Sequence, residues 1–444
     1  MKQSPLRQSG MQKEDIFKQF KAMKSKDAVW QTGRMFGLIY EAGEDVEALV
    51  KEAQAEFTIA NGLNPMAFPS LLRMENEVVA TVISLTGGDS ETVGSVTTGG
   101  TESIFMALKA ARDWSRTKKP AVSQPEVVIP VTAHPAWNKA AHYLNLKVVT
   151  VPVDKNFRAD VPATEAAMND NTIVIGATAV TYPHGIMDPI AELGELALKH
   201  EVWLHVDACL GGLILPFLKK GGTHVPAYGF DVPGVSSVSA DIHKYAYTPK
   251  GISVVMYRDA SLRQYQFFIY TDWPGGVYAT PAMSGGRSGG LIAAAWAVFH
   301  YLGEDGFVRL ATQAKQATDN LRAGIQAIPE LTVLGDPAAT VFAIASSKIN
   351  IFELGARMND RGWHIETQHL PPSLHMTVSP VHAKIVDQFL SDLKAVVPEI
   401  PPVNAETLSE QAALYAMIGT LPDRKLAHEM VLQFVNDIYC LKDR

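Results

Sequence analysis

The residues with the clearest chemical potential follow two predicted strands. Lys244 lies in SADIHKY (239–245), just after the predicted strand 236–240, and Asp207 lies at the end of the predicted strand 202–208. Open α/β sheets bind ligands at the carboxyl ends of their strands. A lysine becomes a nucleophile there when partial burial keeps its amine neutral. Each residue also has a plainer interpretation, a solvated loop lysine for Lys244 and a helix-capping or loop acid for Asp207.

Lys244 and Asp207 together indicate a particular cofactor more specifically than either residue does alone. Asp207 stands in an otherwise apolar segment, and a buried carboxylate is costly unless a cation pairs with it. A protonated pyridine nitrogen is such a cation, and the pairing maintains the ring as an electron sink. The combination predicts pyridoxal 5′-phosphate as the cofactor, with Lys244 as the Schiff-base lysine and Asp207 beside the ring nitrogen.

A glycine-containing turn offers a place for the cofactor phosphate. The segment 95–114 runs from a predicted strand through Gly99 and Gly100 into an amphipathic helix that begins near Thr101. Free N–H groups and the helix dipole favour an anion at such a helix start. The position at which a nucleotide-binding P-loop needs lysine is Gly100, which disfavours a triphosphate site. The plainer interpretation is helix capping by Thr101.

His134 occupies a comparable position after the predicted strand 127–131. An imidazole there could stack on a flat heteroaromatic ring, although a single histidine at a helix start is more often a cap or a surface residue. The 13 histidines show no His-Glu-x-x-His or similar spacing, so we predict no metal. Cys209 is most simply a small buried side chain.

The elements that must position these residues alternate between short apolar strands and helical segments. This alternation predicts an α/β fold with a mostly parallel sheet. The run 252–257 follows its predecessor too closely for a helical crossover, so we expect an antiparallel neighbour there. The runs assigned to the parallel part of the sheet are 127–131, 147–153, 172–177, 202–208 and 236–240.

Three regions are expected along the chain. Residues 1–57 form a tail and a helical arm, and residues 58–310 form a large cofactor-binding α/β domain. Residues 311–444 form a small α+β domain with a helical tail after the Pro-rich linker 398–403. An apolar helix near 291–302 is expected to end the large domain.

The amino-acid composition limits the binding partners and the cellular compartment that we expect for the protein. The net charge of −7 gives no general attraction to nucleic acid or to acidic membranes. Two cysteines, Cys209 and Cys440, cannot build a disulfide framework, which suits a reducing compartment. The N-terminus lacks the apolar core of a signal peptide, and the apolar stretch 291–299 is too short to span a bilayer. We therefore expect a soluble, cytoplasmic protein without a transmembrane segment.

Several ordered motifs resemble the sphingosine-1-phosphate lyase family of the type I pyridoxal-phosphate fold. The resemblance implies retro-aldol cleavage of a phosphorylated sphingoid base into a long-chain aldehyde and phosphoethanolamine. It covers the chain from about residue 36 into the C-terminal tail. The segments that carry it are TTGGTES (97–103), HVDACLGG (205–212), SADIHKYAYTPKG (239–251), YTDWPGGVYATP (270–281) and GGRSGG (285–290).

The resemblance implies roles for the residues nearest the cofactor. Lys244 matches the lysine that carries it, Asp207 matches the partner of the ring nitrogen, and His134 matches the histidine that stacks on the ring. Three further matches lie near the cofactor phosphate: Gly100, Thr101 and His243.

Other matches concern the substrate. Tyr40 and Lys250 match residues that the family places near the substrate phosphate and the reacting hydroxyl. Tyr182 lies where the family carries an aromatic residue. Arg287 is either a cationic anchor for the substrate phosphate or half of a structural salt bridge. Asn64 stands where the family has histidine, and because an amide carries no charge, this change predicts altered phosphate affinity or substrate choice.

The resemblance also implies a homodimer in which the loop 278–287 reaches the cofactor phosphate of the partner. The nearest rival interpretation is an amino-acid decarboxylase of the same fold, which would use the same Lys244 and Asp207. The bond held perpendicular to the ring is the one that breaks, and groups outside the cofactor motifs set that orientation. A third interpretation, a binding protein on a degenerate enzyme fold, is disfavoured by the intact Lys244, Asp207 and His134.

Overall fold

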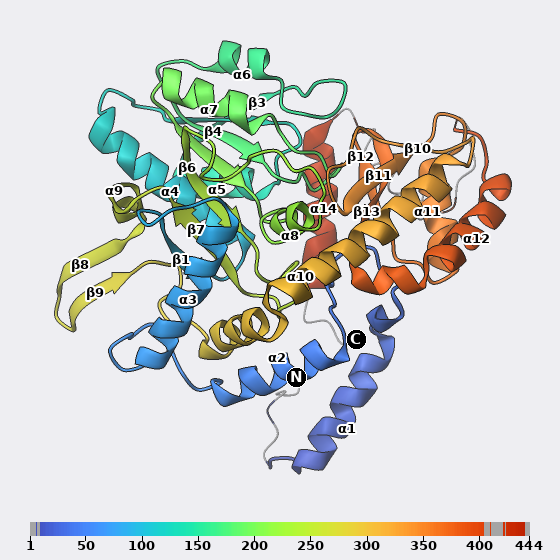
Figure 1. Cartoon of the computed structure of the whole chain (residues 1–444), viewed down its shortest axis with the longest axis horizontal. Coiled ribbons are helices and arrows are strands. Elements are labelled where there is room, and N and C mark those ends of the chain that lie inside the picture. Colours follow the sequence, from blue (N-terminus) through green and yellow to red (C-terminus); the bar gives the residue numbers. More distant parts are fainter. Residues whose placement is uncertain (1–5, 7–8, 404–408, 410–420, 422, 440–444) are drawn as a thin grey trace.

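A seven-stranded sheet forms the centre of the larger part of the molecule (Figure 1). The computed structural model describes residues 6, 9–403, 409, 421 and 423–439. The strands lie in the order β1-β7-β6-β5-β4-β2-β3. Their bounds are β1 (Val93–Thr97), β2 (Glu126–Pro130), β3 (Lys147–Val151), β4 (Thr172–Thr178), β5 (Trp203–Asp207), β6 (Val235–Ala240) and β7 (Ser253–Tyr257).

The pairing confirms the expected mixed sheet. Strands β3, β2, β4, β5 and β6 are parallel neighbours, whereas β7 is antiparallel to both β6 and β1. The connection from β6 to β7 has no helix, because an antiparallel neighbour needs no crossover. The carboxyl ends of β4, β5 and β6 therefore meet at one edge of the sheet, and Asp207 and Lys244 come to that edge from adjacent strands.

Helices cover both faces of this sheet, which explains why its strands are apolar without alternation. In β7, Val254 and Met256 belong to one buried cluster and Val255 and Tyr257 to another on the opposite face. The covering helices are α3 (Pro69–Leu85), α4 (Gly100–Lys118), α5 (Ala136–Leu144), α6 (Val161–Ala167), α7 (Ile190–Lys199), α8 (Leu215–Lys220) and α9 (Ala260–Arg263).

The predicted N-terminal arm is two helices rather than one. Helix α1 (Lys13–Met23) has no buried residue, and α2 (Glu44–Glu56) buries Val46 and Val50. Between them the chain forms two short 3-10 turns, and Phe36 in this stretch packs into the core of the smaller part of the molecule. The N-terminal segment is thus bound to both parts.

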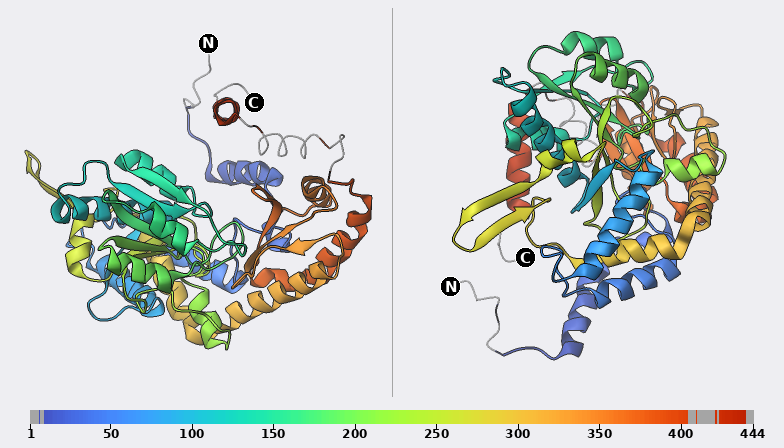
Figure 2. Two further views of the ribbon diagram at one scale, coloured as in Figure 1. Left: turned by 90° about the horizontal axis from the view of Figure 1, so that it is seen from above. Right: turned by 60° about the vertical axis from the view of Figure 1, so that its left-hand side comes forward.

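A long helix joins the two parts. Helix α10 (Gly289–Gln326) extends well beyond the predicted 291–302, and it packs against α2 and α3 and then against α12 (Val386–Val396). The left view of Figure 2 shows it passing along both parts. At Gly303 the backbone leaves the helical conformation, with φ at 54°, a value that glycine adopts most readily. The predicted domain boundary at residue 310 falls inside α10 and stays a prediction.

The smaller part confirms the expected α+β composition. Its four-stranded antiparallel sheet has the order β10-β11-β13-β12. Helix α14 lies in the expected C-terminal tail; most of residues 404–422, and Cys440, lie outside the described residues. The elements are β10 (Thr332–Val333), β11 (Val341–Ala345), α11 (Ile351–Asp360), β12 (Glu366–His369), β13 (Pro372–Thr377), α12 and α14 (Arg424–Ile438).

A hairpin that the sequence did not reveal extends from the large part (Figure 1). Its strands are β8 (Phe268–Trp273) and β9 (Gly276–Thr280), and they pair only with each other. Its apolar side chains, among them Phe268, Trp273 and Val277, are exposed. Elsewhere, no helix among the described residues is both long and apolar enough to cross a membrane.

Candidate active site

One cavity of about 490 Å³ brings together most of the predicted site residues. It lies at the carboxyl ends of the central strands. The N-terminal segment and the smaller part of the molecule, called the small domain below, complete its walls. Nine of the eleven predicted residues line it: Tyr40, Gly100, Thr101, His134, Tyr182, Asp207, His243, Lys244 and Lys250. Asn64 and Arg287 do not.

Lys244 is held by an acid that sequence reasoning overlooked. Its Nζ lies 2.9 Å from Oδ2 of Asp241, which is only 3% exposed. Burial disfavours the charged form of Lys244, but the Asp241 carboxylate, together with Tyr40 and Cys209, outweighs burial and raises the pKa of the amine. The signal was present in the motif, because an acid three residues before a lysine at a strand end can face it. The ammonium must release its proton before it can act as a nucleophile.

Asp207 has the environment that the cofactor prediction requires. It is 4% exposed and its Oδ1 accepts a hydrogen bond from the Cys209 backbone N–H at 3.0 Å. No lysine, arginine or histidine in the described part of the chain forms an ion pair with it. A buried carboxylate without a cation is unfavourable, so the position fits a ligand that brings its own positive charge, as a pyridinium does. Cys209 is buried as predicted, and burial raises the pKa of its thiol.

His134 presents a neutral ring to the same cavity. Its Nδ1 accepts a hydrogen bond from the Ala136 N–H at 3.1 Å, and burial lowers the pKa of the imidazole. A neutral ring fixed by its own backbone can stack on a planar ligand without adding charge. Among the described residues, no group of three or more His, Cys, Asp or Glu side chains is arranged to hold a metal ion.

The glycine turn has a geometry that fits the predicted seat for an anion. Gly99 precedes α4 with φ at 148° and no side-chain cap, and α4 begins at Gly100, so Thr101 is not the capping residue. A Cβ on Gly100 would approach Cys209 Sγ to 2.7 Å, which leaves room for hydrogen only. Glu102 fixes the turn, since its carboxylate accepts the Thr98 N–H at 2.6 Å. Gly100 and Thr101, which carry the first N–H groups of α4, both line the cavity.

His243, Lys250 and Tyr40 form another part of the wall. Lys250 Nζ donates to the His243 carbonyl at 3.2 Å and lies 4.7 Å from the centre of the Tyr40 ring. Burial, followed by the charge of Lys244, lowers the pKa of Lys250 to about 8. Burial raises the pKa of Tyr40 to about 12. Lys250 is therefore the group on this wall that can exchange a proton near neutral pH.

The small domain supplies a wall of the site through contacts that the sequence did not indicate. The Tyr182 hydroxyl donates a hydrogen bond to Oε2 of Glu366 in β12. The Tyr182 ring also stacks on His375 of β13, with centroids 4.1 Å apart. Burial, followed by this hydrogen bond, raises the pKa of Tyr182. Tyr182 therefore remains protonated and joins the two domains at the cavity. Nothing near Glu366 in the sequence marks it as a site residue.

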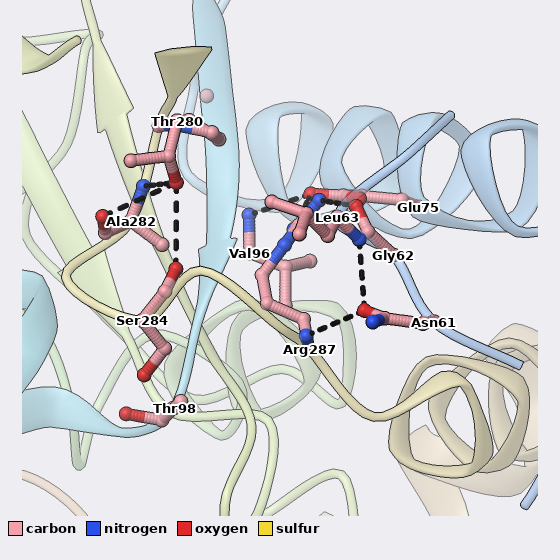
Figure 3. A network of polar contacts seen from close by, with 12 residues as sticks. Asn61, Gly62, Leu63, Glu75, Val96, Thr98, Thr280, Ala282, Ser284 and Arg287 are labelled. Carbon is pink, nitrogen blue, oxygen red and sulfur yellow. Dashed lines mark hydrogen bonds and ion pairs between the residues drawn. The ribbon is translucent and has the colours of Figure 1, made fainter. Parts of the chain in front are cut away.

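Arg287 belongs to a polar network outside the cavity (Figure 3), and Asn64 lies in a neighbouring turn. The Arg287 guanidinium contacts the Glu75 carboxylate at 2.5 Å and the Gly62 carbonyl at 2.8 Å. Its backbone N–H donates to Asn61. Asn64 is exposed, and its side chain accepts hydrogen bonds from two backbone N–H groups of the same turn. Within one chain Arg287 forms the structural salt bridge, and a phosphate-binding role for either residue stays a prediction.

Comparisons with known proteins agree on one family. The family model described as the pyridoxal-dependent decarboxylase conserved domain matches residues 4–343. The sphingosine-1-phosphate lyase of Arabidopsis thaliana is 40% identical over 96% of this chain and 79% of its own length. Sphingosine-1-phosphate lyase 1 of Rattus norvegicus is 39% identical over 97% of this chain and 76% of its own length.

Solved structures give the same result. The sphingosine-1-phosphate lyase of Burkholderia pseudomallei superposes with a TM-score of 0.90 at 34% identity, covering 99% of this chain and 98% of that one. Glutamate decarboxylase of Lactobacillus brevis, with a TM-score of 0.80 at 18% identity over 92% of this chain and 97% of that one, is similar in fold alone.

Proposed function

Because the chain belongs to the sphingosine-1-phosphate lyase family, we propose that it cleaves phosphorylated sphingoid bases with pyridoxal 5′-phosphate as its cofactor. The reaction is a retro-aldol cleavage between carbons 2 and 3 that yields a long-chain aldehyde and phosphoethanolamine. The observation that carries this proposal is the single cavity lined by Lys244, Asp207 and Lys250. An attachment lysine, an unpaired buried acid and a basic amine near neutral pKa are the groups that this reaction needs.

The cofactor side of the cavity is assigned first. When bound, the pyridoxal ring supplies an electron sink for the pair released as the carbon–carbon bond breaks. Lys244 attaches the cofactor, Asp207 pairs with its ring nitrogen, and His134 lies against its ring. The backbone N–H groups at Gly100 and Thr101 bind its phosphate, with His243 beside them. The buried positions of Asp207 and His134 support this assignment.

Lys250 is the proposed general base. Its pKa of about 8 leaves a useful fraction of neutral amine at neutral pH. A base within reach of the substrate's 3-hydroxyl accepts that proton as the bond to carbon 2 breaks. Tyr40, protonated, is a donor that can hold the hydroxyl or the substrate phosphate in position, whereas Tyr182 donates its hydrogen bond to Glu366 and contributes its aromatic ring.

We also propose a homodimer with shared active sites. Two features support it: the exposed apolar residues Phe268, Trp273 and Val277 of the β8–β9 hairpin, and the position of Asn64 and Arg287 outside the cavity of their own chain. A partner that covers the hairpin would remove apolar surface from water. The expected cytoplasmic location stays part of this proposal, supported by cysteine usage.

The proposed function is tested by measuring cleavage of the substrate directly. The cofactor-loaded protein is incubated with sphingosine-1-phosphate, and long-chain aldehyde and phosphoethanolamine are measured by mass spectrometry. Equal amounts of both products are expected, with none from Lys244→Ala protein treated in parallel. Release of carbon dioxide from an amino acid, with the phosphorylated base left intact, would instead establish the decarboxylase.

A further inference from the structure

We propose that a second cavity, beside the active site, binds the alkyl chain of the substrate. This inference deepens the function proposed above and rests on it for the identity of the ligand. The second cavity has a volume of about 250 Å³ and lies between the N-terminal segment 39–54 and the loop 247–250. Nothing in the assigned chemistry uses it.

The two cavities meet at a common wall. Tyr40, His243 and Lys250 line both of them. Lys250 is also the proposed base for the 3-hydroxyl. The alkyl chain of a sphingoid base is attached to the same carbon as that hydroxyl. A substrate with its hydroxyl at Lys250 therefore has the first methylenes of its chain beside the wall that the second cavity shares.

The volumes support this division of the substrate. Pockets that enclose a whole drug-sized ligand measure roughly 300 to 1,000 Å³. The active-site cavity, at about 490 Å³, must hold the cofactor as well as the reacting end of the substrate. The second cavity, at about 250 Å³, is too small for a complete ligand and suits part of one. Together they offer separate space for the polar head and for the beginning of an apolar chain.

The chemistry of the second cavity also suits an alkyl chain. Its walls include six apolar side chains: Trp30, Ile39, Ala42, Val46, Val50 and Pro249. The charged pair Glu47 and Lys51, with 2.6 Å between its atoms, has side chains that are 33% and 69% exposed. Burial raises the pKa of Glu41, which favours its neutral form beside apolar neighbours. An alkyl chain gains from burial against such walls, whereas a second phosphate would not.

The first experiment measures chain-length preference. The ratio of kcat/KM for a long-chain over a short-chain phosphorylated 2-amino-1,3-diol is compared between wild type and Ala42→Phe, which fills the cavity. We expect the ratio to fall about tenfold, the loss expected when roughly two methylene groups are no longer buried. Ala53→Phe is the matched control, because Ala53 lies on α2, a helix that lines the second cavity through Val46 and Val50, but itself lines a different hollow, beside Trp296.

A second variant provides an independent test in case Ala42→Phe does not fold. Trp30→Ala opens the wall of the cavity at a partly exposed residue and should lower the same ratio about threefold by removing contact with the chain. If Ala42→Phe and Trp30→Ala both leave the ratio at its wild-type value, or change it no more than Ala53→Phe does, the alkyl chain lies elsewhere and the inference is wrong.

A binding measurement separates this inference from the proposed function. Dodecyl phosphate and butyl phosphate are titrated into the cofactor-loaded protein by calorimetry. Tighter binding of the dodecyl compound in wild type, weakened in Ala42→Phe but not in Ala53→Phe, supports an alkyl site even if no sphingosine-1-phosphate is cleaved. Equal binding of the two compounds overturns it. A shift in sedimentation coefficient in Ala42→Phe, with no change in binding, would show that a second copy of the chain fills this space.

Discussion

The two sides of the active-site cavity are built in different ways. The cofactor side comes from the ends of neighbouring strands of one sheet, with Asp207 after β5 and Lys244 after β6. The substrate side combines Tyr40 from the N-terminal segment with Tyr182, which is held by Glu366 from the small domain. Strand pairing fixes the first side, whereas contacts between distant segments fix the second.

This difference separates two kinds of failure. A change on the cofactor side should remove the cofactor or its chemistry and leave the domains in place. A change on the substrate side should leave the cofactor bound and alter how the substrate is held or how its proton is removed. Four substitutions test that separation.

Lys244→Ala should have the largest effect. Without the amine, the cofactor has no covalent attachment, and turnover should fall by about 1,000-fold or more. Borohydride reduction followed by mass spectrometry should find the cofactor adduct on wild type and on the exposed-lysine control Lys155→Ala, but not on Lys244→Ala. An adduct at full occupancy on Lys244→Ala would contradict the assignment.

Asp207→Asn should lower cofactor affinity by about 100-fold or more, because it removes one partner of a buried ion pair. The same substitution should raise the melting temperature of the cofactor-free protein, since the buried carboxylate has no cation there. Equilibrium dialysis and thermal melts with and without cofactor measure the two effects. Equal destabilisation in both states would indicate a purely structural carboxylate.

Lys250→Ala should reduce turnover about 100-fold while the cofactor stays bound. In wild type, kcat should rise about tenfold between pH 7 and pH 9, because the amine, with a pKa of about 8, loses its proton over that interval. That rise should disappear in Lys250→Ala and persist in Lys155→Ala. A pH profile unchanged by the substitution would assign the proton transfer to another group.

Glu366→Gln should have the smallest effect. It weakens the hydrogen bond that positions Tyr182, so KM should rise about tenfold with a smaller change in kcat and none in cofactor affinity. The exposed Glu192→Gln is the control. If cofactor affinity fell as much as substrate affinity, the two sides of the cavity would not be independent.

The sequence predicted that Lys244, Asp207 and His134 lie together, as they do in one cavity, because these residues follow apolar strands and parallel strands place their ends together. It predicted the mixed sheet for the same reason. Asp241 was missed although its motif was in view, since an acid beside a lysine is often only a surface pair. Glu366 and the wall around Tyr182 carry no local signal, because tertiary contacts across more than 180 residues create them.

Two regions differed from expectation because their causes are not local. Helix α10 continues past residue 302 since its second half finds an apolar partner in the small domain. The β8–β9 hairpin has exposed apolar residues, a pattern that predicts strands only when a partner sheet is known. Arg287 illustrates the same limit, because the sequence could not distinguish its ion pair with Glu75 from a phosphate contact.

Gly303 divides α10 into two helical segments joined at one non-helical residue. The first half of the helix is attached to the large domain and the second half to the small one, with a non-helical residue at the joint. A side chain at this position would stiffen the joint, because its φ of 54° is one that other residues seldom adopt. Rotation at Gly303 would move the small domain, and with it β12 and Glu366. The position of this wall of the cavity relative to the central sheet would then depend in part on one backbone torsion, at Gly303.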